Sequence, residues 1–197
     1  DAGVPGWLDS LGIYIPDWDR LIERGIGGLV AAARESHAGS VGERREFLQA
    51  VIESLEAVAL LIRRYAGEVR GCLRSEENPT RRAELAEIAA RCDRVAWEPA
   101  GTFLDALQLI QLVHMALSCL VGGRDVTPGR VDQYLLPLFR SDLAQGQLDE
   151  DDAAALLAMF FLRLSQMGGS GTDFDDNTRR TPCRYTHLYV TVGGVDA

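Results

Sequence analysis

The fold of this chain is organised by the stretch from Trp97 to Tyr134, which reads WEPAGTFLDALQLIQLVHMALSCLVGGRDVTPGRVDQY. A helix is predicted to begin at Thr102, just after Pro99, because Thr102 and Asp105 form a capping signature. In that signature each side chain can bond to a backbone N–H that lacks a partner in the first turn. The residues that follow, to about Val121, are apolar on nearly every side. Such a helix is buried, so we expect it to lie in the core.

A polar seam interrupts this apolar helix. Its four residues are spaced three, three and four apart and therefore share one face: Gln108, Gln111, His114 and Ser118. A membrane span would not carry these residues and an aspartate, so the membrane interpretation is rejected. The seam either bonds to neighbouring elements or lines an internal cavity. We favour the first alternative, because buried polar groups are reliably paired.

Composition limits the classes of function. The chain has 197 residues, 47% hydrophobic and 25% charged, with a net charge of −9. Its 20 basic residues are all Arg, and they form no basic stripe, so nucleic acid is not an expected partner. No C-x-x-C occurs among its four cysteines, which argues against a zinc site and a disulfide framework and favours a reducing cytoplasm. The sequence shows no signal peptide and predicts no metal site.

Further elements are predicted around the central helix. We expect helices over residues 17–36, 43–74, 79–93, 130–140 and from 149 onward, and a strand over 186–192. Asn78 is predicted to cap the third of these helices and Asp149 the last. Gly25 and Gly27 weaken the first of these helices unless a neighbour packs closely there. The second helix is predicted to bury one stripe, formed by Phe47, Val51, Leu55, Val58, Ile62, Tyr65 and Val69. The acidic stretch 173–184 lacks the Gly and Glu of a calcium loop.

The central stretch also resembles a known family. The segments EPAGTFLDALQLIQLVH and GRVDQYLLPLF are similar to glycyl radical enzymes, the relatives of pyruvate formate-lyase. The element GRVDQY is closer to the branch of diol dehydratases, choline lyases and arylacetate decarboxylases. The resemblance continues at residues 15–18 and 192–196 in family order. It implies an α/β fold, of which residues 1–197 form the mostly helical N-terminal portion of a single ten-stranded barrel domain, truncated at both ends.

The resemblance also implies an enzyme that cleaves a C–C, C–O or C–N bond in a small organic substrate as a radical lyase or dehydratase. Such enzymes store a radical on a Gly in an R-V-x-G-[FYW] motif and pass it to a Cys, often in a G-C-x-E motif. A radical S-adenosylmethionine activating enzyme installs the radical, and the full-length protein is expected to be a homodimer. Neither motif occurs in these 197 residues; Gly71-Cys72-Leu73-Arg74 lacks the Glu. No catalytic residue is therefore assigned, and the chain alone is expected to be inert.

Three substrate-binding candidates follow from the same resemblance. Thr127 keeps the hydroxyl of a family Ser that faces the substrate. Ile13 stands where many members have a pocket His, which implies a substrate that is less polar at that end. Alternatively, Ile13 packs behind the pocket and Tyr14 supplies the polar contact. Gly101 stands where an Arg is usual, and this departure also leaves the substrate class open.

Arg130, Asp132 and Tyr134 belong to the family motif, and a structural role is preferred for them over substrate contact. Arg130 and Asp132 can cap helices or pair with each other. Two other classes of function remain open. One is an inactive relative that serves as a binding or regulatory subunit, and the other is an unrelated helical interaction domain. The coding sequence beyond Ala197 would separate these classes.

Overall fold

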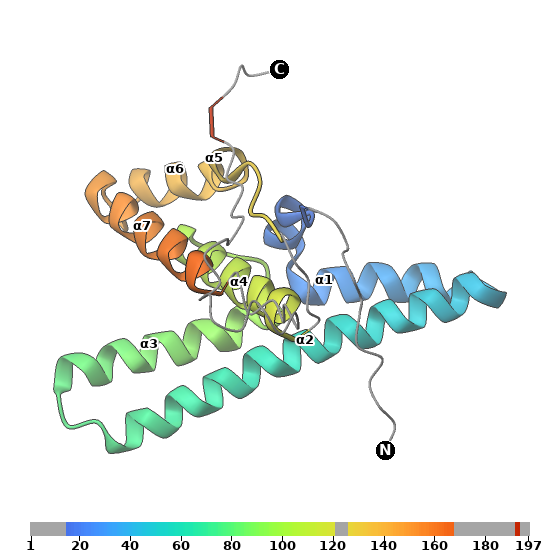
Figure 1. Ribbon diagram of the computed structural model, residues 1–197, viewed down its shortest axis with the longest axis horizontal. Helices are drawn as coiled ribbons and strands as arrows, with labels where there is room; N and C mark the ends of the chain where they lie inside the picture. Colours follow the sequence, from blue (N-terminus) through green and yellow to red (C-terminus); the bar gives the residue numbers. More distant parts are fainter. Residues whose placement is uncertain (1–14, 121–125, 168–191, 194–197) are drawn as a thin grey trace, which may run out of the picture. The chain divides into compact units, whose positions relative to one another are not determined.

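The computed structural model describes residues 15–120, 126–167 and 192–193 (Figure 1). Regular structure in these ranges is helical, which confirms the mostly helical character predicted from the sequence. The elements are α1 (Trp18–Ala38), α2 (Gly42–Ser75), α3 (Pro79–Val95), α4 (Phe103–Met115), the π-helix η1 (Ala116–Leu120), α5 (Val131–Tyr134), α6 (Leu136–Ala144) and α7 (Glu150–Met167). The predicted strand 186–192 and the acidic stretch lie outside the described residues, apart from Val192. The ten-stranded barrel stays a prediction.

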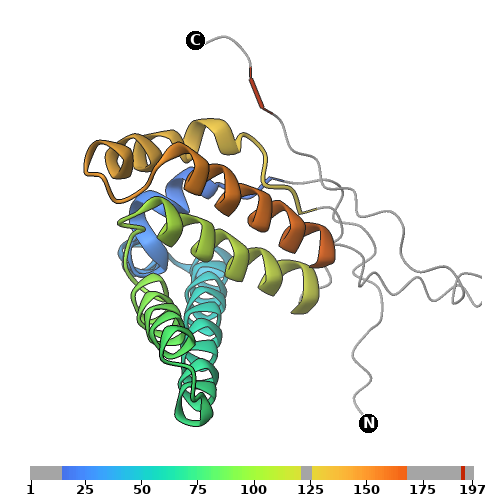
Figure 2. The ribbon, with the colours of Figure 1, turned by 90° about the vertical axis from the view of Figure 1, so that its left-hand side faces the viewer.

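The chain divides into two compact units, residues 19–109 and residues 1–18 with 110–197. In the first unit, α2 and α3 lie side by side as an antiparallel hairpin (Figures 1 and 2). Asn78 caps α3 as predicted, because its side-chain oxygen accepts the N–H groups of Thr80 at 2.9 Å and Arg81 at 3.3 Å. Pro79 follows in the first turn, where no intrahelical N–H bond is needed.

The buried face of α2 differs from the predicted stripe. Phe47 is 67% exposed and Tyr65 is 39% exposed, so their predicted burial was wrong. The buried residues of α2 are Ile52, Ala59, Ile62 and Ala66. Apolar residues cover more than one face of this helix, and spacing alone cannot tell which face meets a partner.

The segment that precedes α4 packs against a break in α1. Gly25 has a φ of 62° and a ψ of 171°, which interrupts the helical backbone. Residues 97–100, which precede α4, bond to α1 on both sides of this interruption. Gly27 N–H donates to the carbonyl of Trp97 at 2.8 Å, and Ala100 N–H donates to the carbonyl of Ile22 at 3.1 Å. A Cβ on Gly25 would lie 2.4 Å from the carbonyl carbon of Glu98. The close packing that these glycines required is therefore present.

The central helix begins as predicted. Asp105 N–H donates to the hydroxyl of Thr102 at 3.0 Å. The carboxylate of Asp105, which is buried, is paired with Arg94 at 2.9 Å and with Arg91 at 3.3 Å, both on α3. The helix is fully buried at Ala106, Leu109 and Ile110. It does not run regularly to Val121: the α-helical pattern ends at Met115 and widens into the π-helix η1.

The predicted helix 130–140 is divided into α5 and α6 at Leu135. Pro137, in the first turn of α6, has no N–H to donate to the carbonyl of residue 133, so a continuous helix cannot be hydrogen-bonded there. The chain then reverses direction into α7 (Figures 1 and 2). Asp149 caps α7 as predicted and accepts Asp152 N–H at 2.7 Å. The buried residues of α7 include Phe160 and Leu164.

Candidate functional site

The candidate site is built around residues Val126–Gly129, here called the strap, all of which are buried. Three successive carbonyl oxygens of the strap accept hydrogen bonds from side chains. His114 Nε2 lies 2.9 Å from the carbonyl oxygen of Val126, Trp18 Nε1 donates to that of Thr127 at 2.9 Å, and Tyr134 Oη donates to that of Pro128 at 2.7 Å. The three side chains come from α4, α1 and α5. We call them the three donors.

His114 has a defined tautomer in this arrangement. A carbonyl oxygen only accepts, so Nε2 carries the proton, and Nδ1 is left as an acceptor 3.4 Å from the hydroxyl of Ser118. Burial lowers the pKa of His114 below its usual value, and the bond to Val126 opposes that shift only in part. The imidazole is therefore neutral at physiological pH. For His114 and Ser118, this is the satisfied polar seam that the sequence favoured.

The strap turns at Gly129 because only glycine fits there. Gly129 N–H donates to the hydroxyl oxygen of Thr127 at 3.0 Å. The φ of Gly129 is +62°, and a Cβ added to it would lie 2.8 Å from Cγ2 of Ile15. Thr127 itself is 1% exposed. The bond from Gly129 N–H therefore holds the hydroxyl oxygen of Thr127 against the backbone of its own turn.

Arg130 and Asp132 pair with each other, one of the two arrangements expected from the sequence. Nε and one terminal nitrogen of Arg130 each donate to a carboxylate oxygen of Asp132 at 3.0 Å. The carboxylate also accepts Gly193 N–H at 3.1 Å. The hydrogen bonds from Arg130 are the main reason that the pKa of Asp132 lies below its usual value. The pair comes directly after the strap in the chain, at the start of α5.

Tyr134 remains a hydrogen-bond donor under all ordinary conditions. Burial raises the pKa of its phenol far above the usual value, and the negative charge of Asp132 adds to this shift. The phenol is thus protonated and keeps its bond to Pro128. Leaving a buried strap carbonyl without its donor would cost about 1–3 kcal/mol.

The structure brings four of the sequence-predicted residues together: Thr127, Arg130, Asp132 and Tyr134. Ile13 and Tyr14 lie outside the described residues. Sequence reasoning did not assign Trp18 to this site, although a buried indole N–H requires an acceptor. The partners are 109 residues apart, and no local pattern connects them.

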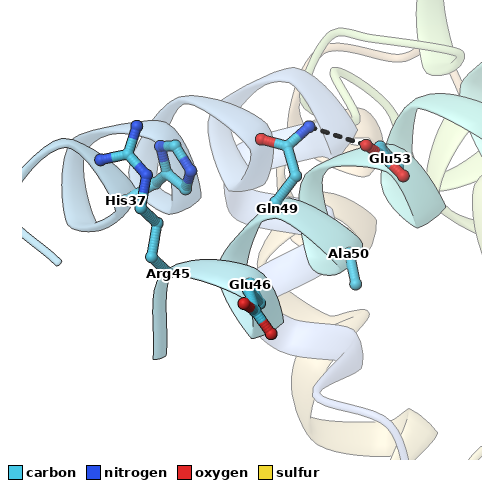
Figure 3. A pocket seen from close by; sticks show the side chains of 6 residues that line it. All are labelled: His37, Arg45, Glu46, Gln49, Ala50 and Glu53. Atoms are coloured by element: carbon cyan, nitrogen blue, oxygen red, sulfur yellow. Dashed lines mark hydrogen bonds between the residues drawn. The ribbon is translucent and has the colours of Figure 1, made fainter. Parts of the chain in front are cut away.

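A surface pocket lies between the end of α1 and the start of α2 (Figure 3). It is lined by His37, Arg45, Glu46, Gln49, Ala50 and Glu53, and Gln49 donates to Glu53 at 2.8 Å. Its charged groups are of both signs, and most of its lining is exposed. The described part of the chain holds no cluster of three or more His, Cys, Asp or Glu side chains suited to a metal ion. The strap is therefore the better candidate site.

None of the helices in the described ranges is long and apolar enough to cross a membrane.

Comparison with known proteins gives consistent matches along the chain. The family model described as pyruvate formate lyase-like matches residues 8–196. The isethionate sulfite-lyase of Oleidesulfovibrio alaskensis is 32% identical over 196 residues, which cover 92% of this chain and 23% of that protein. The probable dehydratase YbiW of Escherichia coli K12 is 36% identical over 154 residues, covering 75% of this chain and 19% of that protein.

A solved structure agrees with these matches. The glycerol-bound B12-independent glycerol dehydratase of Clostridium butyricum superposes with a TM-score of 0.80 and 26% identity. The match covers 90% of this chain and 23% of that one. The chain thus spans less than a quarter of the length of the relatives it matches.

Proposed function

This chain belongs to the pyruvate formate lyase-like family of glycyl radical enzymes, and we propose that it works as part of a radical lyase or dehydratase. The reaction would cleave a C–C, C–O or C–N bond of a small organic substrate. The observation that carries the proposal is the family match over residues 8–196. The contacts of the family motif GRVDQY support it, because Arg130 pairs with Asp132 and Tyr134 bonds to the strap carbonyl of Pro128. The relatives named above act on different substrates, so the substrate class is proposed separately.

The role proposed for this part of the enzyme is to provide helical scaffold and one wall of the substrate pocket. Thr127 is the proposed polar contact, and its hydroxyl oxygen is oriented by Gly129 N–H at 3.0 Å. Ile13 and Tyr14 are proposed to face the substrate as well. An isoleucine cannot bond to a substrate hydroxyl, and a buried hydroxyl left unpaired costs about 1–3 kcal/mol. We therefore propose a substrate that is apolar at the end near Ile13.

The chemistry is proposed to depend on groups outside these 197 residues. A glycyl radical, installed by a radical S-adenosylmethionine activating enzyme, would generate the thiyl that abstracts hydrogen from the substrate. Neither the radical Gly motif nor the Cys motif is present here, so this chain alone is proposed to be inert. The complete protein is proposed to be a cytoplasmic homodimer.

Electron paramagnetic resonance tests this proposal. The complete protein encoded by the open reading frame is incubated anaerobically with a radical S-adenosylmethionine activating enzyme, with the 197-residue chain as the matched control. We expect a glycyl doublet from the complete protein and none from the chain. A doublet from the chain would show that it is not inert. No doublet from the complete protein would favour an inactive relative with a binding or regulatory role.

The variant Ile13→His tests the substrate proposal in the complete, activated enzyme. We expect the variant to lose turnover of the native substrate and to gain weak dehydration of polyols, because the imidazole can bond to a hydroxyl. Efficient turnover of glycerol or propanediol by the unaltered enzyme would contradict the proposal. An unchanged substrate profile in the variant would contradict it too.

A further inference from the structure

We propose that Trp18, His114 and Tyr134 are positioning residues that fix the direction of the Thr127 hydroxyl. The substrate role of Thr127 rests on the proposed function, whereas its positioning rests on contacts within the strap. The three donors bond to the carbonyl oxygens of Val126, Thr127 and Pro128. The first two of these oxygens belong to the peptide units on either side of Thr127, and the third belongs to the next peptide unit. Rotation of any of these peptide planes would therefore break the bond to its carbonyl oxygen.

The three donors lie where they can hold the strap against local motion. Trp18 and His114 are 1% and 2% exposed, and the burial of Tyr134 keeps its phenol protonated by raising its pKa. Burial matters because water cannot replace a lost donor without entering the site. The three donors also come from separate parts of the chain, so bonds from positions 18, 114 and 134 hold the strap.

The position of the Thr127 hydroxyl depends on the strap carbonyls being held in place. Its oxygen accepts Gly129 N–H, and the turn that brings the two together needs the positive φ of Gly129. If the strap carbonyls turn, the hydroxyl and the amide separate. The protection of the Gly129 amide against hydrogen exchange therefore reports the position of the Thr127 hydroxyl, whether or not a substrate is known.

The test is hydrogen–deuterium exchange, read by mass spectrometry at the Gly129 amide in the complete protein. Tyr134→Phe keeps the ring and removes the donor. Trp18→Phe keeps an aromatic side chain but replaces the indole by a smaller ring without an N–H, and Trp97→Phe makes the same change elsewhere. Thr127→Val removes the acceptor for Gly129 N–H directly, and Thr127→Ser restores a hydroxyl. Matched controls are Trp97→Phe, in the other unit, and Tyr65→Phe, on α2.

We expect Gly129 exchange to rise about tenfold or more in Trp18→Phe, Tyr134→Phe and Thr127→Val, as for the loss of one hydrogen bond of ordinary strength. Thr127→Ser and both controls should keep the protection. Unchanged exchange in the two donor variants would overturn the proposal. An equal rise in α2 and α3 would also overturn it, because the donors would then only support global stability. The glycyl doublet tests the proposed function separately, since that signal does not depend on Gly129 exchange.

Discussion

His114 donates its Nε2 proton to the carbonyl oxygen of Val126 at 2.9 Å. This bond joins the end of α4 to the strap and leaves Nδ1 facing the hydroxyl of Ser118. The ring is 2% exposed, so protonating Nδ1 would place a charge in a buried site and remove the acceptor. Both consequences explain why the neutral form of His114 is favoured in the folded protein.

The free energy of unfolding should therefore decrease in acid, because His114 is protonated more readily in the unfolded state. Its folded pKa lies below the usual value of 6.5, so the unfolded state binds more protons as the pH decreases past that value. The contribution of His114 is present above about pH 6.5 and is lost below it. Urea unfolding at pH 7.5 and 5.5 measures this loss. His114→Gln should reduce the difference between the two pH values. Equal pH dependence in the variant and the unaltered protein would contradict the assignment.

The glycines of the α1 break should not tolerate alanine. In Gly25→Ala the new Cβ would meet backbone atoms of Glu98 and Pro99 at 2.4–2.6 Å, at a φ that side chains rarely adopt. We expect the free energy of unfolding to fall by more than about 3 kcal/mol. The control is Gly67→Ala on α2, where no atom lies within 4 Å. There the free energy of unfolding should rise by about 0.5–1 kcal/mol. Similar effects at both positions would contradict the packing argument.

The ion pairs of Asp105 should be important for joining α3 to α4. Asp105→Asn leaves Arg91, whose side chain is only 14% exposed, without its carboxylate partner. Breaking a buried pair costs about 3–5 kcal/mol, and we expect roughly 2–4 because Arg94 is half exposed. The matched control is Glu84→Gln, which removes the exposed pair with Arg81 and should cost at most about 1 kcal/mol. Chemical denaturation decides between these values; equal losses would show that burial does not matter here.

Two described cysteines should differ in reactivity. Burial raises the pKa of the Cys92 thiol, which is 2% exposed, whereas Cys72 is exposed at the end of α2. Because the thiolate is the nucleophile, iodoacetamide at pH 8 should label Cys72 and leave Cys92 unmodified until the protein unfolds. Peptide mapping by mass spectrometry measures both sites in one sample. Labelling of Cys92 at the rate of Cys72 under native conditions would contradict its buried position.

Local chemistry was readable from the sequence. The caps at Asn78, Thr102 and Asp149 depend on residues two or three positions away, so their signatures are complete within a few residues. The sequence likewise indicated that Arg130 and Asp132 could pair or cap helices, and the geometry of their pair is set within one turn. The preference for a structural role over substrate contact stays a prediction, and the substrate role of Thr127 stays a proposal.

Choices between faces and partners were decided by the tertiary structure. The sequence of α2 offers apolar residues on several faces. Ile62 is buried as predicted, but only packing selected Ala59 and Ala66 over Phe47 and Tyr65.

By itself, then, the sequence determined where most of the helices lie, three of their caps and the family, because these depend on short-range periodicity and ordered motifs. Only the tertiary structure decided that Trp18 bonds to Thr127, 109 residues away, and that the α1 break receives residues 97–100. A buried donor must find an acceptor, but the rule does not say which one. That choice is made when the helices pack and water is excluded from the strap.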